Sequence, residues 1–185
     1  MRRGKPLAGR STVRPATVED LHELAALFRA EAETEAAFAP SVELLPGIDW
    51  TAYVRQVLEQ PRTAVHVVER GGTLTGFMTV RMSARPARRT PSVRRLVRAI
   101  LRRGRPAPVR LIEPQLAGVV EHIYIAPDDR SYGTLALLVR TSLDWLRGQG
   151  ATLAEGRILA ANERMLTVAR FLGFEPAIVI VRKPL

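Results

Sequence analysis

The chain of 185 residues contains no cysteine. Without thiols a protein forms no disulfide, no thiolate metal site and no cysteine nucleophile. A mechanism that passes through a thioester on the protein is therefore excluded, and any group transfer is direct or uses another residue. We expect no metal centre.

Long apolar runs are also missing. No stretch approaches the roughly 20 apolar residues that span a bilayer. Residues 1–12 carry the charge of a targeting peptide but not the apolar segment of a secretory signal. We therefore expect a soluble, cytoplasmic protein without a membrane span. With 46% hydrophobic residues, a chain of this length is expected to bury one ordinary core.

Acidic residues are absent from two segments, and these segments account for the net charge of +10. Residues 81–110 hold eleven arginines and no acid, and residues 1–14 hold five basic residues and no acid. The rest of the chain has twelve basic residues against all 18 acidic ones. These counts predict a basic flexible arm over residues 1–11 and a single domain over 12–185, with a basic helical insertion at about 84–115.

The insertion has the pattern of an amphipathic helix, with Thr90 as N-cap and Gly104 at its end. One face is apolar and the other is basic: Val93, Leu96, Val97, Ile100 and Leu101 against Arg94, Arg95, Arg98, Arg102 and Arg103. Either the apolar stripe covers the parent domain, or the helix contacts nucleic-acid phosphates, an anionic membrane surface or a partner groove. Aromatic residues are absent from 81–110, so we expect no base stacking. A nucleic-acid role ranks lowest, because the apolar stripe already gives this helix a structural role.

Hydrophobic periodicity predicts strands that first pair locally and then alternate with helices. Thr17 and Asp20 form a capping box before a helix, Asp49 caps a second helix to about Gln60, and Gly71-Gly72 predicts a hairpin. Later helices are expected near 133–147 and 163–172. Strands are expected at 12–15, 64–70, 74–83, 117–126, 151–159 and 177–182. This order predicts a mixed α/β or α+β fold with one continuous twisted sheet.

One turn in this series has the features of a phosphate site. The apolar strand that contains Glu121 ends at Pro127, and the chain then turns through Arg130 into a helix that begins near Gly133. The first N–H groups of a helix have no intrahelical acceptor and favour an anion. Glycine lets the backbone approach such an anion closely. The turn is therefore a candidate pyrophosphate site.

From about Val13 onward the chain resembles the GNAT superfamily of acyl-CoA-dependent N-acyltransferases. The order of elements matches, and Arg130 to Leu135 align with the family's Arg/Gln-x-x-Gly-x-Gly/Ala loop. Asn162 begins a helix that ends in Gly173-Phe174, as the family's Asn-led helix does. The resemblance implies a GNAT-like, mostly antiparallel twisted sheet, helices on both faces, and a V-shaped cleft between strands 4 and 5.

The resemblance also implies a function. An acetyl group passes from acetyl-CoA, the co-substrate, to a primary amine of a small molecule or protein by direct attack in a ternary complex. A backbone N–H of the fourth strand is the expected oxyanion contact. A homodimer fits the family, although the oligomeric state is open. The expected cofactor-binding residues are the pantetheine strand Ile123, Tyr124 and Ile125, the turn Arg130, Ser131, Tyr132, Gly133, Thr134 and Leu135, and the helix cap Asn162.

Glu121 is the candidate general base, because the aligned family position is often acidic. Strict alternation places it on a face with Val119, Ile123 and Ile125, an apolar setting that favours proton uptake by a carboxyl group. The alternative is a structural carboxylate satisfied by backbone groups or an arginine. His122 is expected on the opposite face, where a lone histidine is more often structural.

The chain departs from the family pattern at two positions. Leu135 stands where the loop has a second small residue, so its side chain either crowds the diphosphate or turns into the core. Ala169 stands where many members have the tyrosine that protonates the leaving thiolate, a role left to water, Tyr132 or Tyr124. The alternative function is a weak or inactive GNAT-fold module that binds acyl-CoA or a partner.

Overall fold

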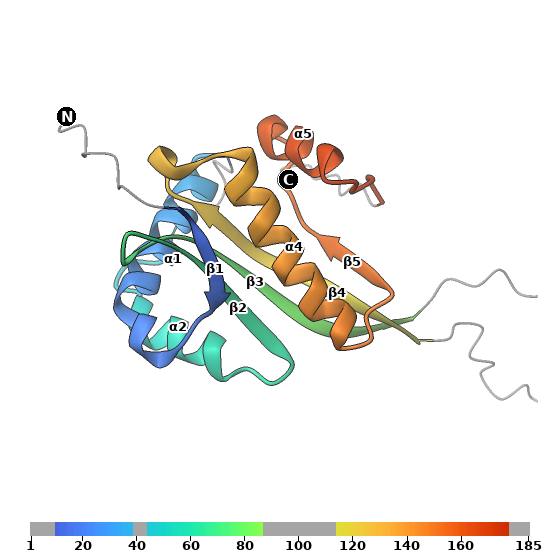
Figure 1. Cartoon of the computed structure of the whole chain (residues 1–185), viewed down its shortest axis with the longest axis horizontal. Coiled ribbons are helices and arrows are strands. Elements are labelled where there is room, and N and C mark those ends of the chain that lie inside the picture. Colours follow the sequence, from blue (N-terminus) through green and yellow to red (C-terminus); the bar gives the residue numbers. More distant parts are fainter. Residues whose placement is uncertain (1–9, 39–43, 87–113, 178–185) are drawn as a thin grey trace, which may run out of the picture.

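The computed structural model describes residues 10–38, 44–86 and 114–177 (Figure 1). Three predicted features lie wholly or almost wholly outside these ranges. They are the N-terminal arm as far as residue 9, the basic helix at 90–104, and the terminal strand near 177–182. They stay predictions.

The described strands form one sheet in the order β1-β2-β3-β4-β5. The first three neighbouring pairs are antiparallel and the last pair is parallel, which confirms a mixed, mostly antiparallel sheet. Predicted and observed bounds agree closely except at the fifth strand, which is shorter than predicted. The strands are β1 Thr12–Pro15, β2 Thr63–Arg70, β3 Thr73–Pro86, β4 Pro114–Ile125 and β5 Leu153–Gly156.

Four α-helices lie in the described ranges: α1 Leu21–Ala36, α2 Trp50–Glu59, α4 Tyr132–Gly148 and α5 Glu163–Phe171. The 3-10 turn η1, Val18–Asp20, precedes α1. The predicted capping box is present, and the Thr17 N–H donates to Asp20 Oδ2 at 2.7 Å. Asp49 Oδ1 accepts from the Ala52 N–H at the start of α2. No helix in the described part of the chain is both long and apolar enough to span a bilayer.

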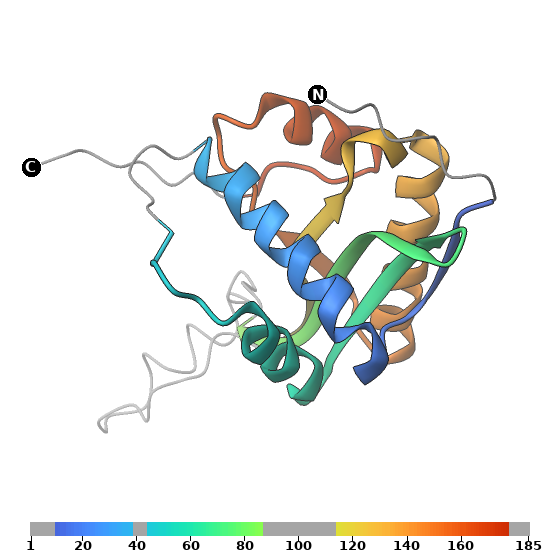
Figure 2. The same ribbon diagram turned by 90° about the vertical axis from the view of Figure 1, so that its left-hand side faces the viewer.

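Helices cover both faces of the sheet (Figures 1 and 2). Helices α1 and α2 pack on one face, around Leu24, Phe28 and Phe77. Helix α4 packs on the other face, where Leu138 and Leu146 meet apolar side chains of β2, β3 and β4. The two faces therefore have separate apolar cores, with the sheet between them.

Glycines end two of the elements as predicted. Gly71 and Gly72 turn β2 into β3 with positive φ angles of 59° and 77°. Gly173, at φ 84°, ends α5 in a Schellman motif: its N–H donates to Arg170 O and the Phe174 N–H donates to Ala169 O, both at 3.0 Å. This motif gives a structural reason for the Gly-Phe ending.

Strands β4 and β5 separate after a short paired region. Ala117 to Val120 pair with Leu153 to Gly156, and in the described ranges no strand pairing continues along this edge beyond Val120 and Gly156. The opening predicted between the fourth and fifth strands is therefore confirmed. From Glu121 to its end, this edge of β4 therefore has no strand partner among the described residues.

Candidate functional site

A β-bulge in β4 determines where Glu121 points. Val120 pairs with Val80 and His122 pairs with Thr79, so Glu121 has no residue opposite it in β3. An extra residue of this kind interrupts the alternation of side chains between the two faces of a sheet. Two consecutive residues, Glu121 and His122, can therefore share one side of the strand.

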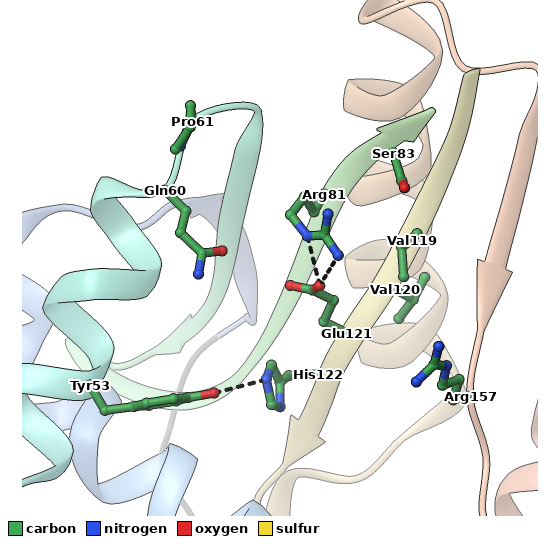
Figure 3. A pocket seen from close by; sticks show the side chains of 10 residues that line it. All are labelled: Tyr53, Gln60, Pro61, Arg81, Ser83, Val119, Val120, Glu121, His122 and Arg157. Atoms are coloured by element: carbon green, nitrogen blue, oxygen red, sulfur yellow. Dashed lines mark hydrogen bonds and ion pairs between the residues drawn. The ribbon is translucent and has the colours of Figure 1, made fainter. Parts of the chain in front are cut away.

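The structure corrects the predicted faces. Glu121 and His122 line the same cavity as Tyr53 of α2 (Figure 3). Ile123 and Ile125 pack instead in the apolar core beneath α4. The prediction that Glu121 shares an apolar face with these isoleucines, opposite His122, is wrong because it assumed an unbroken strand.

The cavity has a volume of about 700 Å³ and lies beside the opening between β4 and β5. Figure 3 shows its lining side chains, which come from α2 and the turn after it, from β3, from β4 and from the segment after β5. They are Tyr53, Gln60, Pro61, Arg81, Ser83, Val119, Val120, Glu121, His122 and Arg157.

Glu121 forms an ion pair with Arg81 of the neighbouring strand. Its Oε1 accepts from Nε of Arg81 at 2.7 Å and also lies 2.7 Å from a terminal guanidinium nitrogen. The predicted alternative, a carboxylate satisfied by an arginine, therefore describes this oxygen. Among the described residues Oε2 has no recorded partner, so this oxygen is the one available to accept a proton.

His122 is held between two helices. Its Nδ1 lies 2.9 Å from Glu31 Oε2, and its Nε2 lies 3.3 Å from the Tyr53 hydroxyl. Glu31, on α1, is only 5% exposed, and its other oxygen accepts from the Ile123 N–H at 2.9 Å. Both oxygens of a buried carboxylate thus fix the strand segment that adjoins Glu121.

The electrostatics of this chain of contacts favour the charged imidazole. Burial alone would lower the pKa of His122, but its hydrogen bond to Glu31 and the negative charges of Glu31, Glu35 and Glu121 outweigh burial, so the pKa is raised. Burial, followed by the charges of Glu31 and Glu121, raises the pKa of Tyr53. At neutral pH the tyrosine is a neutral hydroxyl.

Sequence reasoning missed Glu31, Arg81 and Arg157 as parts of this site. Glu31 carried a usable signal, because it follows Phe28 by three residues and Leu24 by seven, on the apolar stripe of α1. A carboxylate on a buried stripe needs a partner. Arg81 and Arg157 carried no such sequence signal, since their positions depend on pairing between distant segments.

The predicted phosphate turn forms the start of α4. Ser131 is the N-cap, and its Oγ accepts from the Thr134 N–H at 3.1 Å. The N–H groups of Tyr132 and Gly133 lie in the first turn, where a helix offers them no acceptor. A Cβ added at Gly133 would have Ser131 Oγ, 4.0 Å away, as its nearest neighbour, so the space above this backbone is open. These features fit an anion.

Side chains hold the turn in place. Asp129 forms a 2.6 Å ion pair with Arg70 at the end of β2, which fixes the 3-10 turn η2, Pro127–Asp129. Arg130 donates from Nε to Ile125 O at 2.8 Å, and its guanidinium lies 5.8 Å from the centre of the Tyr124 ring. Side-chain contacts, in addition to the backbone, therefore hold the start of α4 at the end of β4.

The structure also shows where the two departures from the family pattern, Leu135 and Ala169, and the helix cap Asn162 lie. Leu135 packs against the core beneath α4, and its N–H donates to Ser131 O at 3.0 Å, so its side chain turns into the core. Ala169 is 9% exposed. Asn162 is the N-cap of α5, with Oδ1 accepting from the Met165 N–H at 3.0 Å. A cofactor contact by Asn162 stays a prediction.

Two exposed aromatic rings bridge the start of α4 and the end of α5. Tyr132 is 62% exposed, Phe171 is 68% exposed, and their ring centres are 4.9 Å apart in an edge-to-face arrangement. In the described ranges, no group of three or more histidine, aspartate or glutamate side chains could hold a metal ion.

Comparison with solved structures identifies the fold. The chain is similar to a tetramutant of the BH1408 protein from Bacillus halodurans, with 15% identity, a TM-score of 0.73, and coverage of 94% of this chain and 99% of that one. It is also similar to the aminoglycoside N-acetyltransferase AAC(6')-Iy in complex with CoA, with 16% identity, a TM-score of 0.64, and coverage of 97% and 98%.

A third similar structure is the ribosomal-protein-alanine N-acetyltransferase from Brucella melitensis biovar Abortus 2308, with 16% identity, a TM-score of 0.59, and coverage of 94% and 100%. No protein-family model matches the chain, and no curated protein matches it in sequence. The structural likenesses confirm the GNAT-like fold that the sequence predicted.

Proposed function

We propose that the protein is an acyl-CoA-dependent N-acetyltransferase that moves an acetyl group from acetyl-CoA to a primary amine. One observation carries this proposal: the open edge of β4 leads from the cavity at Glu121 to the anion turn at the start of α4. Five strand residues span roughly 16 Å. An extended donor lying along this edge has its phosphates at the turn and its thioester beside Glu121.

The chain's own residues then have distinct tasks. The N–H groups of Tyr132 and Gly133, with Ser131 and Thr134 beside them, bind the pyrophosphate at the positive end of the α4 dipole. Ile123, Tyr124 and Ile125 flank the pantetheine arm. The structural neighbour AAC(6')-Iy is in complex with CoA, which supports this use of the fold. Contacts from Arg130, Leu135 and Asn162 to the donor stay predictions.

In the transfer step, the amine nitrogen attacks the thioester carbonyl carbon. A C–N bond forms, the C–S bond breaks, and the sulfur leaves with the bonding electron pair. The amine proton passes to Oε2 of Glu121, directly or through water, and from there to solvent. The thiolate takes a proton from water or from the exposed Tyr132, because Ala169 has no group to supply one.

The first test is donor binding. Acetyl-CoA at about 100 times its Kd should add about 2.7 kcal/mol to the free energy of unfolding, which raises Tm by roughly 5 to 11 °C in a chain of this size. Differential scanning fluorimetry measures this shift. The absence of a shift with acetyl-CoA and with longer acyl-CoAs would overturn the proposed donor.

The second test is turnover. Thiol release with a broad amine panel should fall about a hundredfold or more in Glu121→Gln, because the proton acceptor is lost. Glu33→Gln is the matched control, since Glu33 is exposed on α1 and pairs only with Arg29 among the described residues. Unchanged turnover in Glu121→Gln would remove Glu121 from the mechanism.

Donor binding without any thiol release would favour the alternative function, an acyl-CoA-binding module. The alanine at position 169, in place of the usual acid, also favours this alternative.

A further inference from the structure

Glu121 and Arg157 flank the point where the sheet opens. Val120 and Gly156 are the last paired residues of β4 and β5. Glu121 of β4 and Arg157, directly after β5, are the residues that follow this last pair, and both side chains line the same cavity (Figure 3). A carboxylate and a guanidinium thus lie on the two branches of the opening, where the reacting end of the donor is proposed to reach.

The charges that line the cavity are not balanced. Arg81 is paired with Glu121, and His122 is paired with the buried Glu31. Arg157 is exposed and has no recorded acidic partner in the described part of the chain. A guanidinium carries five N–H donors in a planar fork and stays charged at all working pH values. Among the described lining residues, Arg157 is therefore the cation that is available to an incoming anion.

We infer that the acceptor is a small amine that also carries a carboxylate, with the carboxylate bound by Arg157 and the amine directed to Glu121. This inference rests on the proposed acetyl transfer. A carboxylate matches the fork of a guanidinium with two parallel hydrogen bonds. The volume of about 700 Å³ lies in the range of small-molecule sites, so an acceptor of amino-acid size fits inside it.

The same charges argue against a polycationic acceptor. Aminoglycosides carry several ammonium groups, and like charges in a cleft oppose one another. In the part of the chain that the structure describes, two arginines line this cavity, and a lining carboxylate neutralises one of them. We therefore expect this chain to prefer different acceptors from those of the aminoglycoside N-acetyltransferase with the similar fold.

The test compares acceptors that differ by one carboxylate: lysine against 1,5-diaminopentane, and β-alanine against ethylamine, with an aminoglycoside as a further arm. We expect kcat/KM to be at least about tenfold higher for the carboxylated member of each pair. Arg157→Gln should remove this preference by raising KM for that member, with little change for the other. Arg140→Gln, at an exposed arginine of α4 outside the cavity lining, is the matched control and should keep the preference.

Each result has a distinct meaning. Equal turnover of paired acceptors, a preference for the aminoglycoside, or a preference that survives in Arg157→Gln would overturn the inference while leaving acetyl transfer intact. No turnover with any acceptor would instead count against the proposed function. In that case calorimetric titration of the same pairs into wild type and Arg157→Gln decides the inference, because equal binding by the two proteins would overturn it.

Discussion

Glu31 shows how much one buried carboxylate can determine around a site. It is nearly inaccessible, and its two oxygens hold the His122 ring and the Ile123 N–H. A buried charge is tolerated when it is hydrogen-bonded and paired, as it is here. Because Glu31 stands on α1 and its partners stand on β4, it also joins the helix to the strand that carries Glu121.

At the residue scale we predict the effect of Glu31→Gln. The amide can still accept from Ile123 but cannot neutralise the imidazolium, so the pKa of His122 should fall. A raised histidine pKa contributes stability that is complete below the unfolded value of about 6.5 and is lost as the pH rises through the folded value. The variant should therefore lose about 1.5 to 3 kcal/mol at pH 6 and less at pH 9.

Urea denaturation at the two pH values measures this loss, and NMR titration of the histidine ring protons follows the pKa of His122 directly. Glu33→Gln is the control at an exposed position of the same helix. An unchanged His122 titration in Glu31→Gln would show that the carboxylate does not control the ring.

At the scale of elements, the close packing of β4 against α4 depends on Gly118. A Cβ added there would clash with Leu146 Cδ1 and lie 2.7 Å from Cδ2, and Leu146 is 1% exposed. Gly118 pairs with Met82 on one side and Ala154 on the other, so the strand cannot easily move away. The glycine allows helix and sheet to approach where β4 is paired on both sides.

We predict that Gly118→Ala destabilises the protein by about 1 to 3 kcal/mol, because the core must rearrange around the added methyl group. Gly148→Ala, at the end of α4, is the matched control, since nothing lies within 4 Å of its added Cβ. That change should be neutral or stabilising by up to about 1 kcal/mol through helix propensity. Equal urea midpoints for the two variants would contradict the packing argument.

Elements with local determinants were predictable from the sequence, whereas side-chain faces set by distant pairing were not. The Thr17 capping box, the Gly71-Gly72 turn and the Asn162 cap each depend on residues within a few positions, and all three are present. The bulge at Glu121 depends on register with β3, some forty residues earlier. The position of Arg157 depends on where β5 separates from β4, and no local sequence pattern indicates that point.

At the scale of the whole molecule, the buried His66 and the half-buried His122 respond to pH in opposite directions. His66 lies in the core, 3.0 Å from the hydroxyl of the fully buried Ser142, and burial lowers its pKa. A lowered histidine pKa contributes stability that is present above about 6.5 and is lost as the pH falls through the folded value. His122, with its raised pKa, contributes stability on the acidic side of the same value.

We therefore predict that the free energy of unfolding passes through a maximum near pH 6.5, with slopes of at most about 1.4 kcal/mol per pH unit from each histidine. His66→Gln should reduce the loss on the acidic side, and His122→Gln should reduce the loss on the alkaline side. Burial, followed by the charge of Glu31, raises the pKa of Glu35, so Glu35 also contributes to the pH dependence of stability. Wild type and both variants share this contribution, and it cancels when each variant is compared with wild type.

Urea titrations from pH 5 to pH 9 provide these curves, and their slopes are informative even where a variant is less stable throughout. The assignment fails if His66→Gln leaves the acidic slope as it is in the wild type. Asp20 titrates below this range, because its hydrogen bonds with Arg14 lower its pKa despite burial.

The separation of β4 from β5 inside the sheet bears on aggregation. An unpaired strand edge at the outside of a sheet is a template for pairing with other chains, and so a hazard for aggregation. Here the open edge of β4 begins inside the sheet, after four residues paired with β5, and Glu31 occupies the Ile123 N–H along it. A narrow ligand can lie along such an edge. The edge of another sheet would contact β5 before it reached this part of β4.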